Sequence, residues 1–484
     1  MKFSVENFGP VRQGEFELKP LTVLIGPNNS GKSYMAVLVY ALLQALLGRI
    51  HRGSYGELAL LGEWGPFSPE AYETLKIQRS LVDDLQKLEA RPGASIRDLS
   101  KASEALLLDA LMGRRAAFVD LLEDALQDYF GCEHVANLAR ADDDSPSGSV
   151  EVLTEAAPKP LIDFPLSPEP TLDVSWGGAE LGSTPVSSLT ERKVLASFPL
   201  GGRDITEELW RAWLRTNGVP LGAAYYLPSA RSGILQGSQV LAAAALHIVR
   251  RSFALERIEM PALTGVAGDF LQLLWRQPPP RRRKIPDGLG AALEVLEQEM
   301  FHGDVFFQDQ RTERPVLLYR TRGLELPLNR TSSLVAELAP LDLWIRHLLQ
   351  PGDLLIIDEP EAHQHPANQR NVARVLVRLV QAGIRVICPT HSSLILHQIS
   401  NHILASEADD SVRAELGFTE ADLLKPEDVG VYLFDLQENG TTIRSVPIEP
   451  GFGISEAEFV RVGEAIGEET YRLSASATAS QPRS

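Results

Sequence analysis

Residues 26–33 read Gly26-Pro27-Asn28-Asn29-Ser30-Gly31-Lys32-Ser33. This G-x-x-x-x-G-K-[ST] pattern follows an apolar run at 21–25 and precedes a long apolar segment that begins near Tyr34. That order is typical of a strand, a glycine-rich turn and a helix. Backbone N–H groups of such a turn bind phosphate oxygens, while Lys32 adds a positive charge and Ser33 a hydroxyl ligand for Mg²⁺. We therefore predict that residues 26–33 bind the phosphates of a nucleoside triphosphate such as ATP.

A second motif lies where another apolar run ends in acidic residues. Residues 353–357 read as a strand covered on both faces, and Asp358-Glu359-Pro360 follows them. At the end of such a strand, Asp358 is placed to hold Mg²⁺ and Glu359 to polarise the water that attacks the γ-phosphate. The alternative is a pair of acids that only caps a strand, which the phosphate loop disfavours.

A third motif follows the next apolar run along the chain. Residues 384–388 end at Pro389-Thr390-His391-Ser392. Because ligands of open α/β sheets bind at the carboxyl ends of the strands, we predict that His391 contacts the γ-phosphate. A purely structural histidine is the alternative.

The motifs GPNNSGKS, IIDEPEAHQHP and PTHS together resemble those of ABC-type ATPases of the OLD, RecF and SMC-like group. The resemblance covers residues 1–50 and 310–460. It implies an α/β P-loop NTPase fold of ABC-ATPase type with a mostly helical insertion or lobe. It also implies ATP and Mg²⁺ as cofactors, Glu359 and His391 as catalytic residues, and a homodimer that sandwiches two nucleotides.

Such dimers use a signature segment that reaches the nucleotide of the partner subunit. Residues 328–338 lie at the corresponding place and contain Ser332 and Ser333, which are good N-cap residues for a following helix. We predict that their hydroxyls and the positive end of that helix contact ATP bound to the partner. A capping motif without a ligand would explain the same residues.

Composition and charge indicate which partners and which cellular location to expect. The chain has 484 residues with a net charge of −18, which argues against bulk attraction to nucleic acid or acidic membranes. A local basic segment, Arg281–Lys284, is the candidate for DNA contact, with a solvated loop as its alternative. Two cysteines, no signal-peptide core at 1–6 and no sufficiently long apolar stretch predict a cytoplasmic protein without a membrane partner.

The motifs also suggest how the chain is divided. We expect the chain to rejoin the ATPase sheet at Ala224, after a large insertion. There Arg231 stands where transporter relatives place a glutamine loop. It either contacts a phosphate or couples the insertion to the active site, or it has a packing or salt-bridge role. Asn439-Gly440 predicts a β-hairpin. The expected parts are 1–50 (phosphate loop), 51–220 (insertion, helical then mixed), 221–310 (strand plus helical subdomain), 311–472 (signature, acidic motif and histidine) and 473–484 (disordered tail).

We interpret the chain as an ATP-hydrolysing dimeric switch, acting in DNA maintenance or antiphage defence with a separately encoded effector. OLD proteins often carry a C-terminal Toprim nuclease domain, but no apolar strand ending in Asp-x-Asp follows His391, so we expect an ATPase without its own nuclease. The nucleotide-binding subunit of a transporter is an alternative, which the missing Leu-Ser-Gly-Gly-Gln and the long insertion disfavour. A scaffold that binds ATP without hydrolysing it is another.

Overall fold

The computed structural model describes most of the chain. The described residues are 1–48, 84–85, 87–88, 91, 93–140, 147–156, 159–166, 172–180, 183–186, 205–237, 265–275, 285–308, 316–455 and 457–479. The basic segment Arg281–Lys284, predicted to contact DNA, lies outside them.

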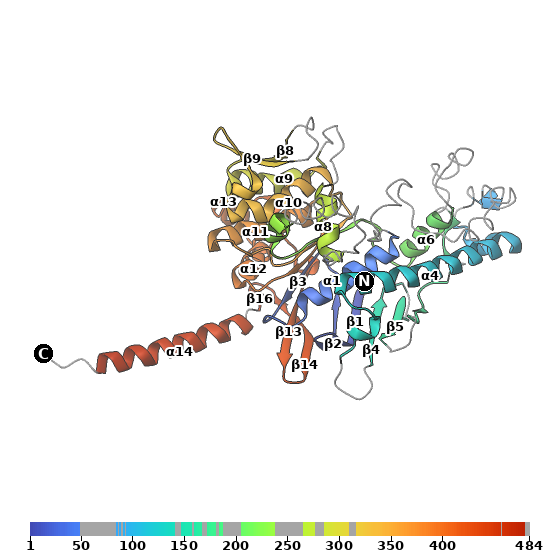
Figure 1. Cartoon of the computed structure of the whole chain (residues 1–484), viewed down its shortest axis with the longest axis horizontal. Helices are drawn as coiled ribbons and strands as arrows, with labels where there is room; N and C mark the ends of the chain where they lie inside the picture. Colours follow the sequence, from blue (N-terminus) through green and yellow to red (C-terminus); the bar gives the residue numbers. More distant parts are fainter. Residues whose placement is uncertain are drawn as a thin grey trace, which may run out of the picture.

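An 11-stranded sheet organises the described chain, in the order β6-β5-β4-β1-β2-β14-β13-β3-β12-β11-β7 (Figure 1). Its strands are β1 (Lys2–Phe8), β2 (Val11–Glu17), β3 (Leu21–Ile25), β4 (Gly148–Leu153), β5 (Ile162–Leu166), β6 (Ser175–Trp176), β7 (Ala224–Leu227), β11 (Leu354–Ile357), β12 (Arg385–Pro389), β13 (Val429–Gln437) and β14 (Gly440–Val446). Strands β13, β3, β12, β11 and β7 are parallel to their neighbours in that series. The β1–β2, β1–β4, β4–β5, β5–β6 and β13–β14 pairs are antiparallel. The predicted α/β class is confirmed.

Two smaller sheets complete the strands of the described chain. One contains β8 (Asp304–Phe307), β9 (Leu317–Thr321) and β10 (Leu324–Pro327), and the other pairs β15 (Ile448–Glu449) with β16 (Gly453–Ile454). The predicted hairpin at Asn439-Gly440 is confirmed as the β13–β14 connection, in which Gln437 pairs with Gly440.

Helices cover both faces of the parallel strands, so those strands are buried on both sides. On β11, Leu354 and Ile356 pack into one hydrophobic core, and Leu355 and Ile357 pack into the other. The first core includes side chains of α1 (Lys32–Leu46), α4 (Lys101–Phe130) and α6 (Ile205–Thr216). The second includes side chains of α8 (Gly265–Trp275), α9 (Leu289–Glu294), α10 (Ser333–His347), α11 (Pro366–Gln381) and α12 (Ser393–Glu407). This two-sided burial explains why residues 354–357 read as an uninterrupted apolar run.

The segment 51–220 contributes to the sheet, which corrects the expectation that the chain rejoins it only at Ala224. Strand β4 pairs antiparallel with β1, placing Val150 opposite Val5, and β5 and β6 extend the sheet outward. A pairing between strands so far apart in the chain leaves no local signal in the sequence. The long helix α4 nevertheless agrees with a largely helical first half.

The C-terminal segment corrects a second expectation. Helix α14 (Ala457–Ala479) continues into the tail for which composition predicts disorder, and it extends away from the rest of the described chain (Figure 1). Alanine is the strongest helix former, so the alternating small residues from 474 are compatible with a helix. An i,i+4 pair between Glu468 and Arg472, 2.7 Å apart, lies just before them. None of the described helices is long and apolar enough to cross a lipid bilayer.

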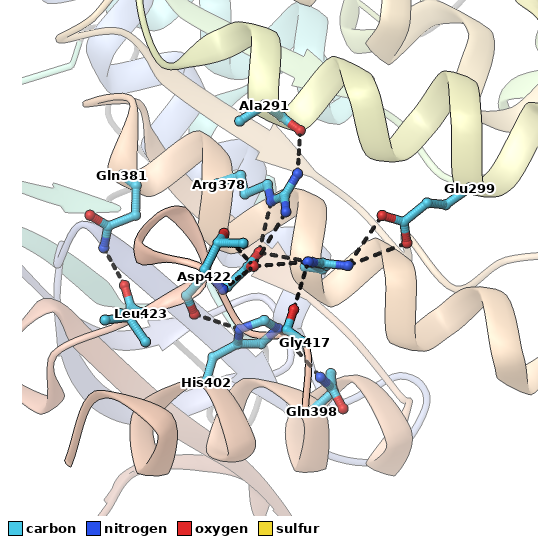
Figure 2. Close-up of polar contacts among 11 residues, drawn as sticks. Ala291, Glu299, Arg378, Gln381, Gln398, His402, Gly417, Asp422 and Leu423 are labelled. Carbon is cyan, nitrogen blue, oxygen red and sulfur yellow. Dashed lines mark hydrogen bonds and ion pairs between the residues drawn. The ribbon is translucent and has the colours of Figure 1, made fainter. Parts of the chain in front are cut away.

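A buried ionic network fixes α11 against the segment that follows α12. Asp422 accepts hydrogen bonds from two arginines of α11: Arg374 Nε lies 2.8 Å and Arg378 Nε 2.7 Å from Asp422 Oδ1. Figure 2 shows Arg378 and Asp422 in this network. Arg374 also donates to Glu299, and Arg378 to the carbonyl oxygen of Ala291. Burial disfavours the charged carboxylate, but the hydrogen bonds from the arginines and Thr419 outweigh it and hold the pKa of Asp422 well below its usual range. The network therefore anchors the helix that follows Asp358-Glu359.

His402 on α12 predicts a pH dependence of stability. Its Nδ1 lies 2.6 Å from the carbonyl oxygen of Asp422, and burial lowers its pKa from 6.5 to about 4. Between these values the unfolded chain binds a proton that the folded chain does not, so stability falls as pH falls. Lowering the pH from 7.5 to 5 should cost about 2 kcal/mol through this residue.

The measurement is the free energy of unfolding in urea at both pH values, for the wild type and for His402→Asn. The variant should lose about 2 kcal/mol less than the wild type on acidification. Groups titrating elsewhere affect both proteins and cancel in the difference. Equal losses would mean that His402 is not held neutral in the folded state.

Candidate functional site

The phosphate loop connects β3 to α1 through a backbone that requires glycine. Gly26 has φ 140°, and a Cβ there would lie 2.5 Å from the carbonyl oxygen of Phe434 on β13. Gly31, with φ 97°, is the N-cap residue of α1. Asn29 also has a positive φ, of 62°. The loop therefore bends sharply onto the N-terminus of α1, whose first N–H groups have no partner within the helix.

Lys32 folds back over this loop. Its Nζ donates to the carbonyl oxygens of Gly26 and Pro27, at 3.0 and 2.7 Å. The side chain is buried, and burial lowers its pKa to about 8 against the opposing effect of Asp358 and nearby glutamates. Lys32 is thus mostly protonated at neutral pH and stays available as a cation inside the loop.

Ser33 and Asp358 meet although 325 residues separate them. The Ser33 hydroxyl donates to Asp358 Oδ1 at 3.0 Å, and the Tyr226 hydroxyl donates to Asp358 Oδ2 at 3.1 Å. Asp358 is 5% exposed, and burial raises its pKa to about 6. Both residues predicted to hold Mg²⁺ therefore lie together, and the carboxyl is mostly ionised at neutral pH.

His391 lies between the phosphate loop and Glu359. Its Nδ1 is 3.5 Å from Lys32 Nζ, and its Nε2 is 3.6 Å from Glu359 Oε1. Burial first, and then the charge of Lys32, lower the pKa of His391, so the ring is neutral at pH 7. Nδ1 of His391 therefore faces the phosphate loop, and Nε2 faces Glu359.

Glu361 fixes the segment that carries His391, a role that the sequence did not reveal. Its Oε1 accepts hydrogen bonds from the Thr390 hydroxyl at 2.9 Å and from the His391 N–H at 2.6 Å. Tyr226, which holds Asp358, was also missed. Each lies next to a predicted motif, Glu361 in Asp-Glu-Pro-Glu and Tyr226 near the end of β7, and that proximity is the only signal the sequence offered.

The signature residues occupy the N-terminus of α10. Ser332 is the N-cap residue, and its hydroxyl accepts from the Val335 N–H at 3.4 Å. Ser332 and Ser333 are both exposed. The predicted helix cap is confirmed, while contact with a partner's nucleotide stays a prediction.

Arg231, for which the sequence left two roles open, is fully buried beside these segments. Its Nε lies 3.2 Å from Glu337 Oε2 on α10, and its Nη1 donates to the carbonyl oxygen of Asp358 at 2.9 Å. The structure therefore gives it a salt bridge.

The residues fit a nucleotide with Mg²⁺. Mg²⁺ prefers hard oxygen ligands. The Ser33 hydroxyl and an Asp358 carboxylate oxygen are ligands of this kind, and they lie 3.0 Å apart. Phosphate oxygens would replace the two loop carbonyls as partners of Lys32. When bound, Mg²⁺ would supply positive charge against the negative charge of the phosphates.

Comparisons with known proteins give one family match. Residues 291–396, which include the acidic motif and His391, match the model described as an AAA ATPase domain. No curated protein matches the chain.

Three solved structures are similar over most of their length. An SMC head bound to the C-winged helix domain of ScpA is 10% identical, with a TM-score of 0.40 over 93% of this chain and 98% of that one. The SMC head domain from Thermotoga maritima is 11% identical, with a TM-score of 0.34 over 92% and 98%. The Smc head domain with an extended coiled coil, bound to the C-terminal domain of ScpA derived from Pyrococcus furiosus, is 11% identical, with a TM-score of 0.38 over 96% and 98%.

The strand order carries the fold assignment. The phosphate loop follows β3, His391 follows the neighbouring β12, and Asp358 follows β11 next to it, all at the carboxyl ends of parallel strands. A mostly antiparallel lobe, in which β14 and β2 pair in parallel, continues the same sheet on the other side of β13. This arrangement is a P-loop fold of the ABC-ATPase type, and residues 291–396 within it are similar to an AAA ATPase domain.

Proposed function

We propose that this chain hydrolyses ATP and works as an ATP-dependent homodimeric switch. The observation that supports this most strongly is the hydrogen bond between Ser33 and Asp358, which brings together the phosphate loop and the acidic motif although 325 residues separate them. Lys32, His391 and Glu359 surround the same point. A loop that only bound phosphate would need neither a carboxylate pair nor a neutral histidine beside it.

Each residue has a distinct proposed role. Residues 26–31 and Lys32 hold the phosphates, and Ser33 with Asp358 holds Mg²⁺. Glu359 accepts a proton from the attacking water, because it lies next to the metal ligand and is partly exposed. His391, whose Nε2 lies 3.6 Å from Glu359 Oε1, is placed beside this base and would contact the γ-phosphate.

The dimer is proposed from the exposed end of α10. Ser332 and Ser333 are exposed at the helix N-terminus, where free N–H groups and the helix dipole attract anions. In a symmetric dimer each subunit would contribute this end to its partner's nucleotide. ATP would then hold the subunits together, and hydrolysis would release them.

A role in DNA maintenance or antiphage defence, with a separately encoded effector, is proposed from the resemblance of the motifs. The net charge of −18 requires any DNA contact to be local, and Arg281–Lys284 is the candidate segment.

One experiment tests the function: ATP turnover and mass in solution of the purified protein, with and without single- and double-stranded DNA. We expect turnover that requires Mg²⁺, and a doubled mass with ATP but not with ADP. Stimulation by DNA that disappears when Arg281, Arg282 and Arg283 become alanine would support the basic segment. A monomer under every nucleotide condition would contradict the switch.

A further inference from the structure

The guanidinium of Arg231 connects three segments of the candidate site. Its Nη1 donates to the carbonyl oxygens of Pro228 and Asp358, at 3.0 and 2.9 Å, and its Nη2 to that of Glu359 at 3.4 Å. Its Nε donates to the carbonyl oxygen of Glu337 at 2.9 Å. The side chain is 0% exposed, so it makes these contacts out of reach of solvent. Three of its partners are backbone atoms of the acidic motif and the turn after β7.

Glu337 of α10 is the second half of this connection. Its carboxylate is also 0% exposed and lies 3.2 Å from Arg231 Nε. Its Oε1 accepts from the Ser232 hydroxyl at 2.6 Å and lies 3.9 Å from His363 Nε2, in the segment after Glu359. The Glu337 carboxylate therefore connects α10, whose N-cap is Ser332, to the turn after β7 and to the segment after the acidic motif.

The backbone at these contacts is held in a costly conformation. Ala230, Glu359 and His363 have φ values of 54°, 46° and 58°, in the left-handed region that residues with a Cβ rarely adopt. Such a conformation is unfavourable for a residue with a Cβ and persists only where neighbouring contacts enforce it. The Nη2 contact to the carbonyl oxygen of Glu359 is one such contact.

We propose that Arg231 is a positioning residue that sets the orientation of Glu359 according to the position of α10. This inference rests on the proposed ATPase function and adds to it a connection, within one subunit, between α10 and Glu359. A displacement of α10, whose N-terminus carries Ser332 and Ser333, would move Glu337 and with it the guanidinium. Because that guanidinium holds the carbonyl oxygens of Asp358 and Glu359, Glu359 reaches its working orientation only when α10 is in place.

Lysine cannot substitute for arginine in this role. The planar guanidinium presents donors in a fixed fork that spans separate acceptors, whereas an ammonium is a single point with three donors. Arg231→Lys keeps the positive charge opposite Glu337 but loses the simultaneous contacts to Asp358 and Glu359. Misplacing a reacting group by about 1 Å can cost on the order of 100-fold in rate.

The test is ATP turnover and ATP affinity of the full-length protein carrying Arg231→Lys, alone and combined with Glu359→Gln. We expect Arg231→Lys to lower kcat about 10- to 100-fold while ATP affinity changes less than about 3-fold. In the Glu359→Gln background the same change should lower kcat further by less than about 2-fold, because two residues acting through one group are not additive. A merely structural arginine would give the same loss in both backgrounds.

Two further variants control for stability. Arg378→Lys makes the same change at another buried, carboxylate-paired arginine, and it should lower thermal stability but leave kcat unchanged. Glu337→Gln keeps an acceptor for Ser232 but removes the ion pair with Arg231. If Arg231→Lys does not fold, Glu337→Gln takes its place, and its effect on kcat is compared alone and combined with Glu359→Gln.

The outcomes separate this inference from the proposed function. Wild-type turnover that depends on Glu359 but not on Arg231, or an additive loss in the double variant, overturns the inference alone. No turnover by the wild type, or none that depends on Glu359, overturns both.

Discussion

Replacing Glu359 with glutamine should lower ATP turnover about 10²- to 10⁴-fold, the contribution typical of a positioned general base. Glutamine keeps the size of the side chain but cannot accept the proton of the attacking water. ATP binding should persist, because the phosphate-loop residues and the Ser33–Asp358 pair are unchanged. The measurement is steady-state phosphate release, together with the affinity for ATP in the presence of Mg²⁺.

This variant separates an enzyme from a scaffold. A protein that uses ATP only to set its shape would release phosphate at the same low rate with Glu359 or glutamine. Asp435→Asn provides a matched control, since it removes a partly exposed carboxylate on β13 that pairs with Arg444. Its turnover should equal that of the wild type.

Replacing Lys32 with alanine should remove most of the affinity for ATP. Lys32 is the cation placed inside the phosphate loop, and a hydrogen bond to a charged group is worth about 1.5–3 kcal/mol, or roughly 10- to 100-fold in affinity. Turnover should fall further, because a donor that stabilises developing charge contributes about 10²- to 10³-fold in rate. The measurement is ATP binding by calorimetry, with phosphate release in parallel.

The expected loss is specific to nucleotide binding. The Lys32 ammonium bonds only loop atoms and His391 among the described residues, and burial already disfavours its charge, so its removal should not unfold the protein. Unchanged ATP affinity in a folded Lys32→Ala variant would show that the phosphates bind elsewhere.

The central part of the fold was predictable because its signals are local. Strands β3, β11 and β12 are short apolar runs. Each is followed by a motif that binds ligands at the carboxyl ends of strands: the phosphate loop, Asp358-Glu359 and His391. The helix cap at Ser332 and the hairpin at Asn439-Gly440 also follow from a few adjacent residues. The structure places the predicted cis residues Lys32, Ser33, Asp358, Glu359 and His391 in one cluster.

What the sequence could not predict depends on contacts between distant residues. The pairing of β4 with β1, the Asp422 network and the bond from Tyr226 to Asp358 each join segments more than 40 residues apart. Arg231 shows the limit most clearly. Its sequence neighbourhood is compatible with phosphate contact, with coupling of the insertion to the active site, and with packing or a salt bridge, and only the buried Glu337 beside it shows the salt bridge.

The central claim is that one subunit supplies the phosphate loop and its partner supplies the end of α10. Mixing two inactive proteins, Lys32→Ala and the Ser332→Ala/Ser333→Ala double variant, tests this most directly. Each mixed dimer would contain one site with both its loop and its serines intact, so an equal mixture should recover about a quarter of wild-type ATP turnover. Turnover no higher than the sum of the two separate proteins would contradict the shared site.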